Sequence, residues 1–238
     1  MKKLDILHSP QITSFEHPHE PYSLSFIFLL DEQSSLLKEC LESIANSFIV
    51  TDPNPATTRP IQCLFIDNGL EPAMEWILMK ILTALPLTVK TLFQCFYHIS
   101  RQQLEESRLR EAVSLSSGSW MCVFYSKLGL PVIHTDFFRV VMDSMRFSNI
   151  AVIITQQESH KKSTQSTQHE QKPLSLASLS NPTTPEYRWD QLLFRRQLCK
   201  SITSSSHLTL QTLIQEDIWK NIIYFCESNR KQIIQLNT

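Results

Sequence analysis

Apolar residues gather in short blocks along the first 155 residues, and polar residues mix with apolar ones between the blocks. A short block that is apolar throughout predicts a strand buried on both faces, as in a parallel sheet. The blocks predict strands at 22–30, 61–66, 88–98, 120–124 and 149–155.

The segments between the blocks repeat apolar residues three and four positions apart, which is the spacing of an amphipathic helix. They predict helices at 36–48, 74–85, 104–113 and 132–147. Strand and helix alternate four times, which favours a doubly wound, mostly parallel α/β sheet flanked by helices. Ligands bind such sheets beyond the carboxyl ends of the strands. We therefore expect the functional side chains to follow the strands, at Asp31, Glu32, Asp67, Asn68, Tyr125, Ser126 and Lys127.

Both ends of the chain differ from this α/β region. Residues 1–21 are polar and interrupted by proline, which predicts a flexible arm. Residues 156–186 are rich in Ser, Thr, Gln, Lys and Pro, which is typical of a flexible loop or a functional lid. Helical spacing resumes at 187–202 and 210–236. We therefore divide the chain into an arm (1–21), an α/β domain (22–202) and a C-terminal helical extension (203–238).

Composition narrows the function classes. The chain has 22 basic and 23 acidic residues, and a net charge of −1 favours neither nucleic acid nor a membrane surface as partner. No apolar run is long enough to span a membrane, and the N-terminus lacks the pattern of a signal peptide. Six cysteines without C-x-x-C spacing indicate reduced thiols in a cytoplasmic protein rather than a zinc site.

Glycine is scarce, because average usage would give about seventeen and the chain has three. We expect Gly69, Gly118 and Gly129 to lie where the backbone needs a positive φ or a close approach. The sequence contains no G-x-G-x-x-G, P-loop or G-x-S-x-G motif. Their absence argues against dinucleotide, ATP and serine-hydrolase chemistry.

The strand ends, taken in order, resemble the family-2 glycosyltransferases, whose catalytic domain has the GT-A fold. "LKECLESI" at 37–44 matches the first helix of the family, and "DNGL" at 67–70 stands where the family has Asp-Asp-Gly-Ser. "ESRLREAVSLSSGSW" at 106–120 stands where the family has an Ala-Arg-Asn helix and a following glycine. The resemblance covers 23–155. It implies a nucleotide-sugar donor, an acceptor, and a divalent metal held by an Asp-x-Asp motif.

The metal motif is replaced in this chain. Aligned on Gly118, the two aspartates become Tyr125 and Lys127, and neither is a ligand that Mg²⁺ or Mn²⁺ prefers. We therefore expect no metal cofactor, and two alternatives stay open. Lys127 supplies the positive charge that the donor diphosphate needs. Otherwise the protein has lost the chemistry and binds a protein partner through its old cleft or its C-terminal helices.

The resemblance assigns the remaining donor contacts. Asp67 matches the aspartate that accepts a hydrogen bond from the base, and its alternative is a turn residue before Gly69. Asp31 and Glu32 replace a Tyr-Asn pair near the base, and their alternative is a pair of acids at a helix N-terminus. The family arginine aligns with Leu109. Its neighbours Arg108 and Arg110 are candidates to reach a phosphate, and we select Arg110; the alternative is that both face solvent.

The catalytic base of the family belongs to an acidic pair before a Trp-rich helix. "PEYRWDQLLFRR" at 185–196 is similar to that segment, with Tyr187 and Arg188 in place of the pair. An inverting transfer needs a carboxylate to deprotonate the acceptor hydroxyl. Asp190 is the catalytic candidate, and its alternative is a polar position on an amphipathic helix.

Overall fold

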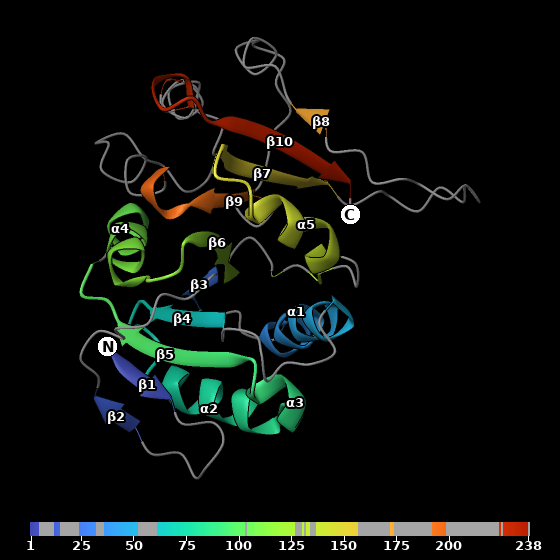
Figure 1. Cartoon of the computed structure of the whole chain (residues 1–238). Coiled ribbons are helices and arrows are strands. Elements are labelled where there is room, and N and C mark those ends of the chain that lie inside the picture. The colour runs from blue at the N-terminus through green and yellow to red at the C-terminus, as the bar shows by residue number, and fades with distance from the viewer. Residues whose placement is uncertain are drawn as a thin grey trace.

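The computed structural model of the chain describes residues 1–4, 12–14, 24–31, 36–51, 61–102, 104–126, 130, 132–133, 137–156, 172–173, 192–198, 224 and 226–237. Ten strands in these ranges form one sheet, in the order β2-β1-β5-β4-β3-β6-β9-β7-β10-β8 (Figure 1). They are β1 (Lys2–Leu4), β2 (Ile12–Ser14), β3 (Leu24–Leu30), β4 (Ile61–Asp67), β5 (Phe93–Ile99), β6 (Trp120–Tyr125), β7 (Ile150–Gln156), β8 (Lys172–Pro173), β9 (Leu192–Arg195) and β10 (Gln232–Asn237).

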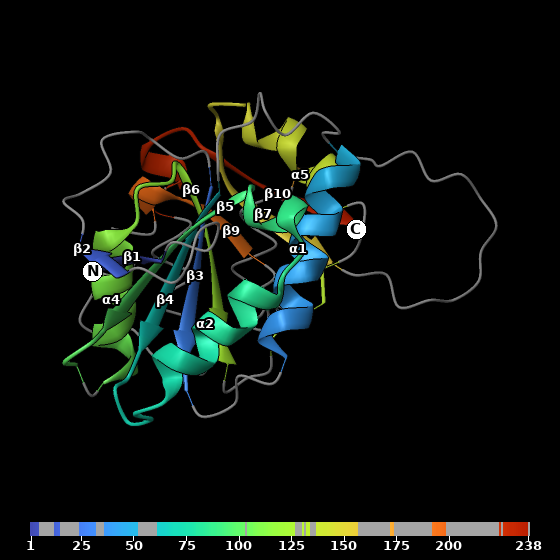
Figure 2. The ribbon, with the colours of Figure 1, turned by 90° about the horizontal axis from the view of Figure 1, so that it is seen from below.

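Helices cover both faces of this sheet. Residues of α1, α2 and α5 pack into one apolar cluster, and residues of α4 pack into a second cluster on the opposite face (Figure 2). This arrangement confirms the expected doubly wound α/β class. The described helices are α1 (Leu37–Thr51), α2 (Met74–Ala84), α3 (Leu87–Lys90), α4 (Glu105–Leu115) and α5 (Phe137–Met145).

The centre of the sheet is parallel. β3 pairs in parallel with both β4 and β6, and β4 pairs in parallel with β5. The first, second and fourth predicted strands are therefore immediate neighbours, so their carboxyl ends lie at the same edge. The strand predicted at 88–98 begins only at Phe93, because residues 87–90 form the short helix α3.

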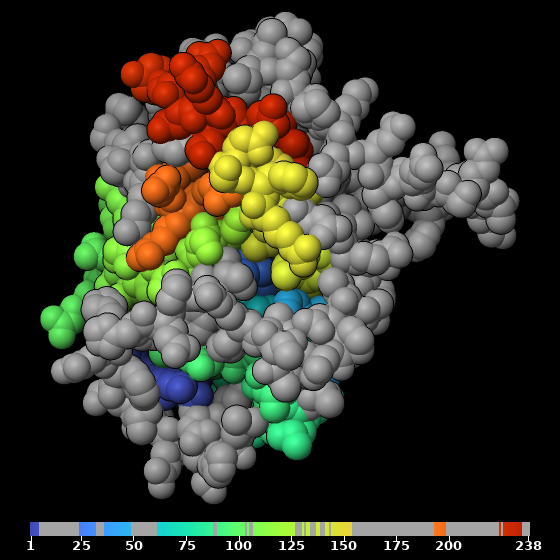
Figure 3. Space-filling model, viewed as in Figure 1, coloured from blue at the N-terminus to red at the C-terminus, as the bar shows by residue number. Residues whose placement is uncertain are grey.

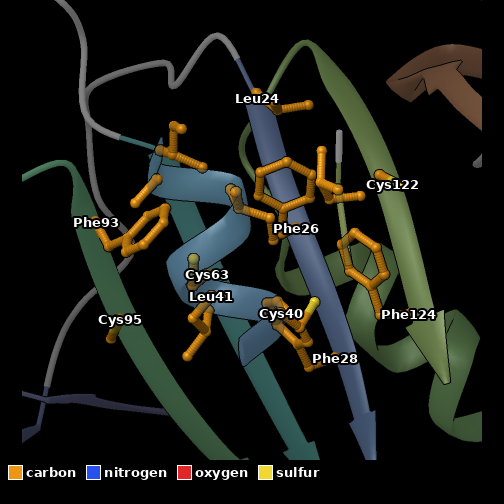
Figure 4. Packing of buried hydrophobic residues seen from close by; sticks show 14 of the residues in the cluster. Leu24, Phe26, Phe28, Cys40, Leu41, Cys63, Phe93, Cys95, Cys122 and Phe124 are labelled. Carbon is orange, nitrogen blue, oxygen red and sulfur yellow. The ribbon is translucent and has the colours of Figure 1, made fainter. Parts of the chain in front are cut away.

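A stack of three aromatic rings fixes the central strands relative to one another. The ring of Phe28 lies 5.0 Å from the rings of both Phe65 and Phe124, measured between centroids. These residues belong to β3, β4 and β6, and Figure 4 shows Phe28 and Phe124 in the cluster beneath α1. Stacked aromatic pairs contribute beyond the area they bury. The stack lies one or two residues before the strands end, so it also holds the three strand ends together.

Two of the glycines have the backbone roles that their scarcity predicts. A Cβ atom on Gly118 would lie 2.6 Å from the backbone nitrogen of Ser25, so only glycine fits against β3. Gly69 has a φ of 72°, in the left-handed region that favours glycine. Gly129 lies outside the described residues.

Two C-terminal segments that we predict as helices contain strands. The prediction of a helix at 187–202 is wrong over 192–195, because β9 pairs antiparallel with β6 on one side and β7 on the other. The prediction at 210–236 is wrong over 232–236, because these residues belong to β10, which pairs in parallel with β7. In both cases ladder hydrogen bonds to existing strands outweigh local helical spacing. The division into an α/β domain and a C-terminal extension stays a prediction.

The predicted N-terminal arm also contains strands. Residues 2–4 form β1, which pairs antiparallel with β5, and residues 12–14 form β2, which pairs antiparallel with β1. Leu4 is buried at this edge of the sheet. The predicted arm thus contains two short strands, and its flexibility stays a prediction.

Segments far apart in the sequence meet at the other end of the sheet. Figure 3 shows surfaces from α5 and β7 (yellow), β9 (orange) and β10 (red) next to one another. No helix in the described ranges is long and apolar enough to cross a bilayer.

Candidate functional site at the carboxyl ends of three strands

The ends of β3, β4 and β6 meet as predicted. Leu30 is in register with Asp67 of β4, and Leu29 is in register with Tyr125 of β6. Directly after β3, the backbone N–H of Asp31 donates to the hydroxyl of Ser126 at 2.8 Å. This bond links the residues that follow two neighbouring strands.

Asp31 is the centre of the polar contacts at this edge. Its Oδ1 accepts hydrogen bonds from Nδ2 of Asn68 at 2.6 Å and from Nη2 of Arg108 at 3.3 Å. Nη1 of Arg108 also donates to the carbonyl oxygen of Leu30, at 3.2 Å. The described residues donate no hydrogen bond to Oδ2 of Asp31, and its side chain is 17% exposed. Among the residues that the structure describes, Oδ1 is thus held in place and Oδ2 has no donor.

The position of Arg108 follows from the packing of α4. Leu109, Ala112 and Val113 bury one side of this helix against the sheet. Arg108 lies four residues before Ala112, so the two share a face. Its side chain is 3% exposed, and a buried guanidinium requires such partners. Arg110, which we selected, is two positions further and points to another side of the helix, where it is partly buried; its contact with a donor stays a prediction.

Asp67 is closed inside the protein. It is 1% exposed, its Oδ1 accepts from the N–H of Gly69 at 3.0 Å, and its Oδ2 accepts from the hydroxyl of Tyr97 at 2.5 Å. Burial, the bond to Asp67, and the charges of Asp67 and Glu75 all raise the pKa of Tyr97. The bond to Gly69 is the one expected of a turn residue before a glycine, which is the alternative role of Asp67. Its contact with a nucleotide base stays a prediction.

The side chains of Asp31 and Asp67 belong to two different networks. Successive side chains of a strand point to opposite faces. Asp67 therefore lies with Tyr97 on the face of α2, and Asp31 lies with Asn68 and Arg108 on the face of α4. The sequence predicts both aspartates at one edge, and only the structure separates them by face.

Tyr125 stands where the resemblance implies the first metal-binding aspartate. Tyr125 is 3% exposed and packs in the apolar cluster on the α4 face, and Ser126 is 1% exposed. A neutral phenol such as that of Tyr125 is not a ligand that Mg²⁺ or Mn²⁺ prefers. Within the described part of the chain no group of three or more His, Cys, Asp or Glu side chains is arranged to hold a metal ion. Glu32, Lys127 and Asp190 lie outside the described residues, so their roles, like that of Tyr125, stay predictions.

A further polar network borders the site where β5 meets α4. Oε2 of Glu111 accepts from the hydroxyl of Ser100 at 2.5 Å, and Oε1 lies 2.8 Å from Nε2 of His98. Burial alone would raise the pKa of Glu111. The hydrogen bonds from Ser100 and His98, with the nearby charges of His98 and the amino terminus, lower it overall. Glu111 is therefore a carboxylate that binds α4 to the end of β5.

Comparison with known proteins gives no match by sequence and clear matches by structure. No protein-family model matches the chain, and no curated protein matches it. The structure of S. aureus TarS 1–349 superposes with a TM-score of 0.57 at 13% identity, covering 90% of this chain and 58% of that one. The same protein in complex with UDP-GlcNAc gives a TM-score of 0.55 at 12% identity, covering 91% of this chain and 58% of that one.

A second protein has the same architecture. The mannosyltransferase PcManGT from Pyrobaculum calidifontis, in complex with GDP-Man and Mn²⁺, superposes with a TM-score of 0.54 at 9% identity. That match covers 93% of this chain and 58% of the other. The chain has a GT-A-like glycosyltransferase fold. At these identities the likeness establishes the fold alone, and the chain spans less than two thirds of the length of these structures.

The GT-A-like chain has site residues that sequence reasoning missed. Arg108 was set aside in favour of Arg110, although its spacing from Ala112 indicates a buried face. Asn68 was expected at this edge, and what the sequence reasoning lacked was its bond to Asp31 on the face of α4. Tyr97 and Glu111 carry no sequence signal for their roles, because their partners lie 30 or 13 positions away.

Proposed function

We propose that this GT-A-like protein binds a nucleotide sugar at the carboxyl ends of β3, β4 and β6 and transfers the sugar without a divalent metal. The observation that carries the proposal is the Asp31 carboxylate, whose Oδ1 is held by Arg108 and Asn68 and whose Oδ2 has no donor among the described residues. It lies where ligands bind in sheets of this class.

The chemistry of Asp31 suits a nucleoside. An ionised carboxylate only accepts hydrogen bonds. The nucleoside groups that donate to it are the ribose hydroxyls and the ring N–H groups of uracil and guanine. UDP-sugars and GDP-sugars are therefore the expected donors.

Lys127 is the group proposed to replace the metal. It follows Ser126 directly in the sequence, and Ser126 is bonded to Asp31. During transfer the bond between the sugar and the diphosphate breaks, and the leaving nucleoside diphosphate gains negative charge. A lysine is a competent point charge for that group. The acceptor hydroxyl forms the new glycosidic bond, and its proton passes to a carboxylate, for which Asp190 is the candidate.

A second function is supported by a specific observation. Asp67 and Tyr125, two of the expected donor contacts, are 1% and 3% exposed. A protein that has lost transfer would close such positions and keep the fold to bind a partner. The alternative is therefore an inactive GT-A-like binding protein, with the C-terminal segment as one surface for a protein partner.

For either function we propose a location in the cytoplasm. The described cysteines are buried free thiols, as in proteins of a reducing compartment: Cys40, Cys63, Cys95, Cys122 and Cys226.

Calorimetric titration of the full chain with UDP-, GDP- and CDP-sugars, with and without Mn²⁺, tests the proposal. We expect binding of UDP- or GDP-sugars that Mn²⁺ does not change. Asp31→Asn and Lys127→Ala should each weaken that binding by roughly tenfold or more, the effect of losing one charged hydrogen bond. Glu42→Gln on α1 is the matched control, because the ion pair of Glu42 is with Lys38 on its own helix, at 3.8 Å.

The outcomes separate the candidates. Flat titrations for every donor would overturn donor binding and favour the partner-binding function. Binding without release of nucleoside diphosphate in the presence of simple sugar and peptide acceptors would favour an inactive binding protein. Binding that requires Mn²⁺ would overturn the metal-independent role of Lys127.

A further inference from the structure

We infer that Glu111 is a positioning residue that holds the Asp31 carboxylate in its binding geometry through helix α4 and Arg108. The inference rests on the proposed function for its consequence in donor binding. Its structural part, the control of the Arg108–Asp31 pair by Glu111, is tested separately. The described side-chain contacts of Glu111 are with Ser100 and His98, so it is proposed to act on Asp31 through other residues.

Glu111 engages both of its oxygens with the end of β5. Ser100 donates to Oε2 at 2.5 Å, and His98 lies 2.8 Å from Oε1. The side chain of Glu111 is 29% exposed and that of His98 is 22% exposed, so the contacts are shielded in part from water. A carboxylate with a hydrogen bond on each oxygen is fixed in two directions. A surface ion pair with a single contact does not fix the orientation of the carboxylate in this way.

The same Ser100 is tied to β4. Its backbone N–H donates to the carbonyl oxygen of Asp67 at 2.9 Å, and its hydroxyl accepts from the N–H of Gln102 at 3.1 Å. Ser100 is 4% exposed. Glu111 therefore attaches α4 to a residue that is itself bound to the end of the neighbouring strand.

Arg108 lies one helical turn before Glu111, on the side of α4 that faces the strand ends. It reaches the end of β3, where it binds the carbonyl oxygen of Leu30 and Oδ1 of Asp31. α4 is thus attached at two points one turn apart, at β5 through Glu111 and at β3 through Arg108. A helix held at both points cannot rotate about its axis without breaking one of them. Loss of the Glu111 contacts leaves α4 held by Arg108 and by its apolar packing, which loosens the position of Arg108 relative to Asp31.

The experiment compares the wild-type chain with Glu111→Gln, Ser100→Ala and the control Glu42→Gln. Glu111→Gln keeps the size of the side chain and places an N–H₂ group against a donor. Ser100→Ala removes one of the two bonds and serves if Glu111→Gln does not fold. Glu42 is a matched control because it is a glutamate on another helix with comparable exposure, 34%. Two quantities are measured: the rotation rate of the Arg108 guanidinium by ¹⁵N NMR, and the dissociation constant for the nucleotide sugar that binds best.

We expect Glu111→Gln and Ser100→Ala to speed rotation of the Arg108 guanidinium and to weaken nucleotide-sugar binding, each by roughly tenfold. Combining Glu111→Gln with Asp31→Asn should weaken binding no further than Asp31→Asn alone, since both act through one carboxylate. Unchanged Arg108 rotation in both variants would overturn the inference, whatever the binding result. If the wild-type chain binds no nucleotide sugar, the proposed function fails, and the Arg108 rotation rate still decides whether Glu111 positions the pair.

Discussion

Nη2 of Arg108 lies 3.3 Å from Oδ1 of Asp31, and this salt bridge joins helix α4 to the end of the first central strand. The two residues are 77 positions apart in the sequence. The guanidinium is almost fully buried and the carboxylate is partly exposed. Removal of one or the other side chain should therefore lower the free energy of unfolding by different amounts.

Removal of Asp31 should destabilise the protein more than removal of Arg108. Asp31→Asn leaves a buried positive charge with weaker partners, and we expect a loss of about 2–3 kcal/mol in the free energy of unfolding. Arg108→Met leaves a carboxylate that can still reach water, and we expect about 1 kcal/mol. Urea denaturation of both variants measures the difference. The double variant should lose less than the sum, and strict additivity would contradict a direct interaction.

Substitution of Gly118 should disrupt the packing of the strands at their amino ends. An alanine Cβ at this position would meet the backbone of Ser25 at 2.6 Å and that of Leu24 at 2.8 Å, and backbone atoms cannot move aside. We expect Gly118→Ala to cost about 3 kcal/mol in urea denaturation. Gly69→Ala is the comparison, with a cost of about 1 kcal/mol from its left-handed φ. Equal effects of the two substitutions would argue against the close approach at Gly118.

Tyr97 should keep its proton well above the pH at which tyrosine ordinarily ionises. Its pKa is raised, so the folded state binds a proton that the unfolded state releases at about pH 10. Stability due to Tyr97 is therefore fully present below that pH and is lost as the pH rises above it. In Tyr97→Phe, this loss should be absent, and the buried Asp67 should lack one donor at a cost of about 1–2 kcal/mol near neutral pH. The measurement is the tyrosinate absorbance of the wild type and of Tyr97→Phe as the pH rises. Equal absorbance in the two proteins until unfolding would support the prediction. Ionisation of Tyr97 in the folded wild type at about pH 10 would contradict it.

The Glu111 network should stabilise the protein at neutral pH and not in acid. The pKa of Glu111 is lowered from its ordinary value of 4.5, so its contribution is present above that pH. The contribution is lost as the pH falls through the lower folded-state pKa. Glu111→Gln should therefore be less stable than wild type near pH 7, and the gap should close in acid. Urea denaturation across that range measures the gap, and a gap that stays constant with pH would show that Glu111 does not act through its charge.

The central strands were predictable because each is buried on both faces and therefore apolar throughout. The block at 61–66 and the block at 120–124 coincide with β4 and β6 to within a residue. Their placement on either side of β3 follows from the right-handed crossovers of an α/β sheet. β9 and β10 were not predictable in this way, since their spacing also suits a helix and only pairing with β6 and β7 selects the strand.

The candidate site was likewise predictable only in part. The sequence by itself determined that polar residues lie at or directly after the ends of β3, β4 and β6, because an acidic side chain such as Asp31 or Asp67 ends a run of apolar residues. Only the tertiary structure decided which face each side chain joins and which arginine reaches it. A carboxylate is bound by whichever donor the packing of a helix brings within about 3 Å. That packing depends on contacts between residues distant in the chain, such as Arg108 and Asp31, which local spacing does not encode.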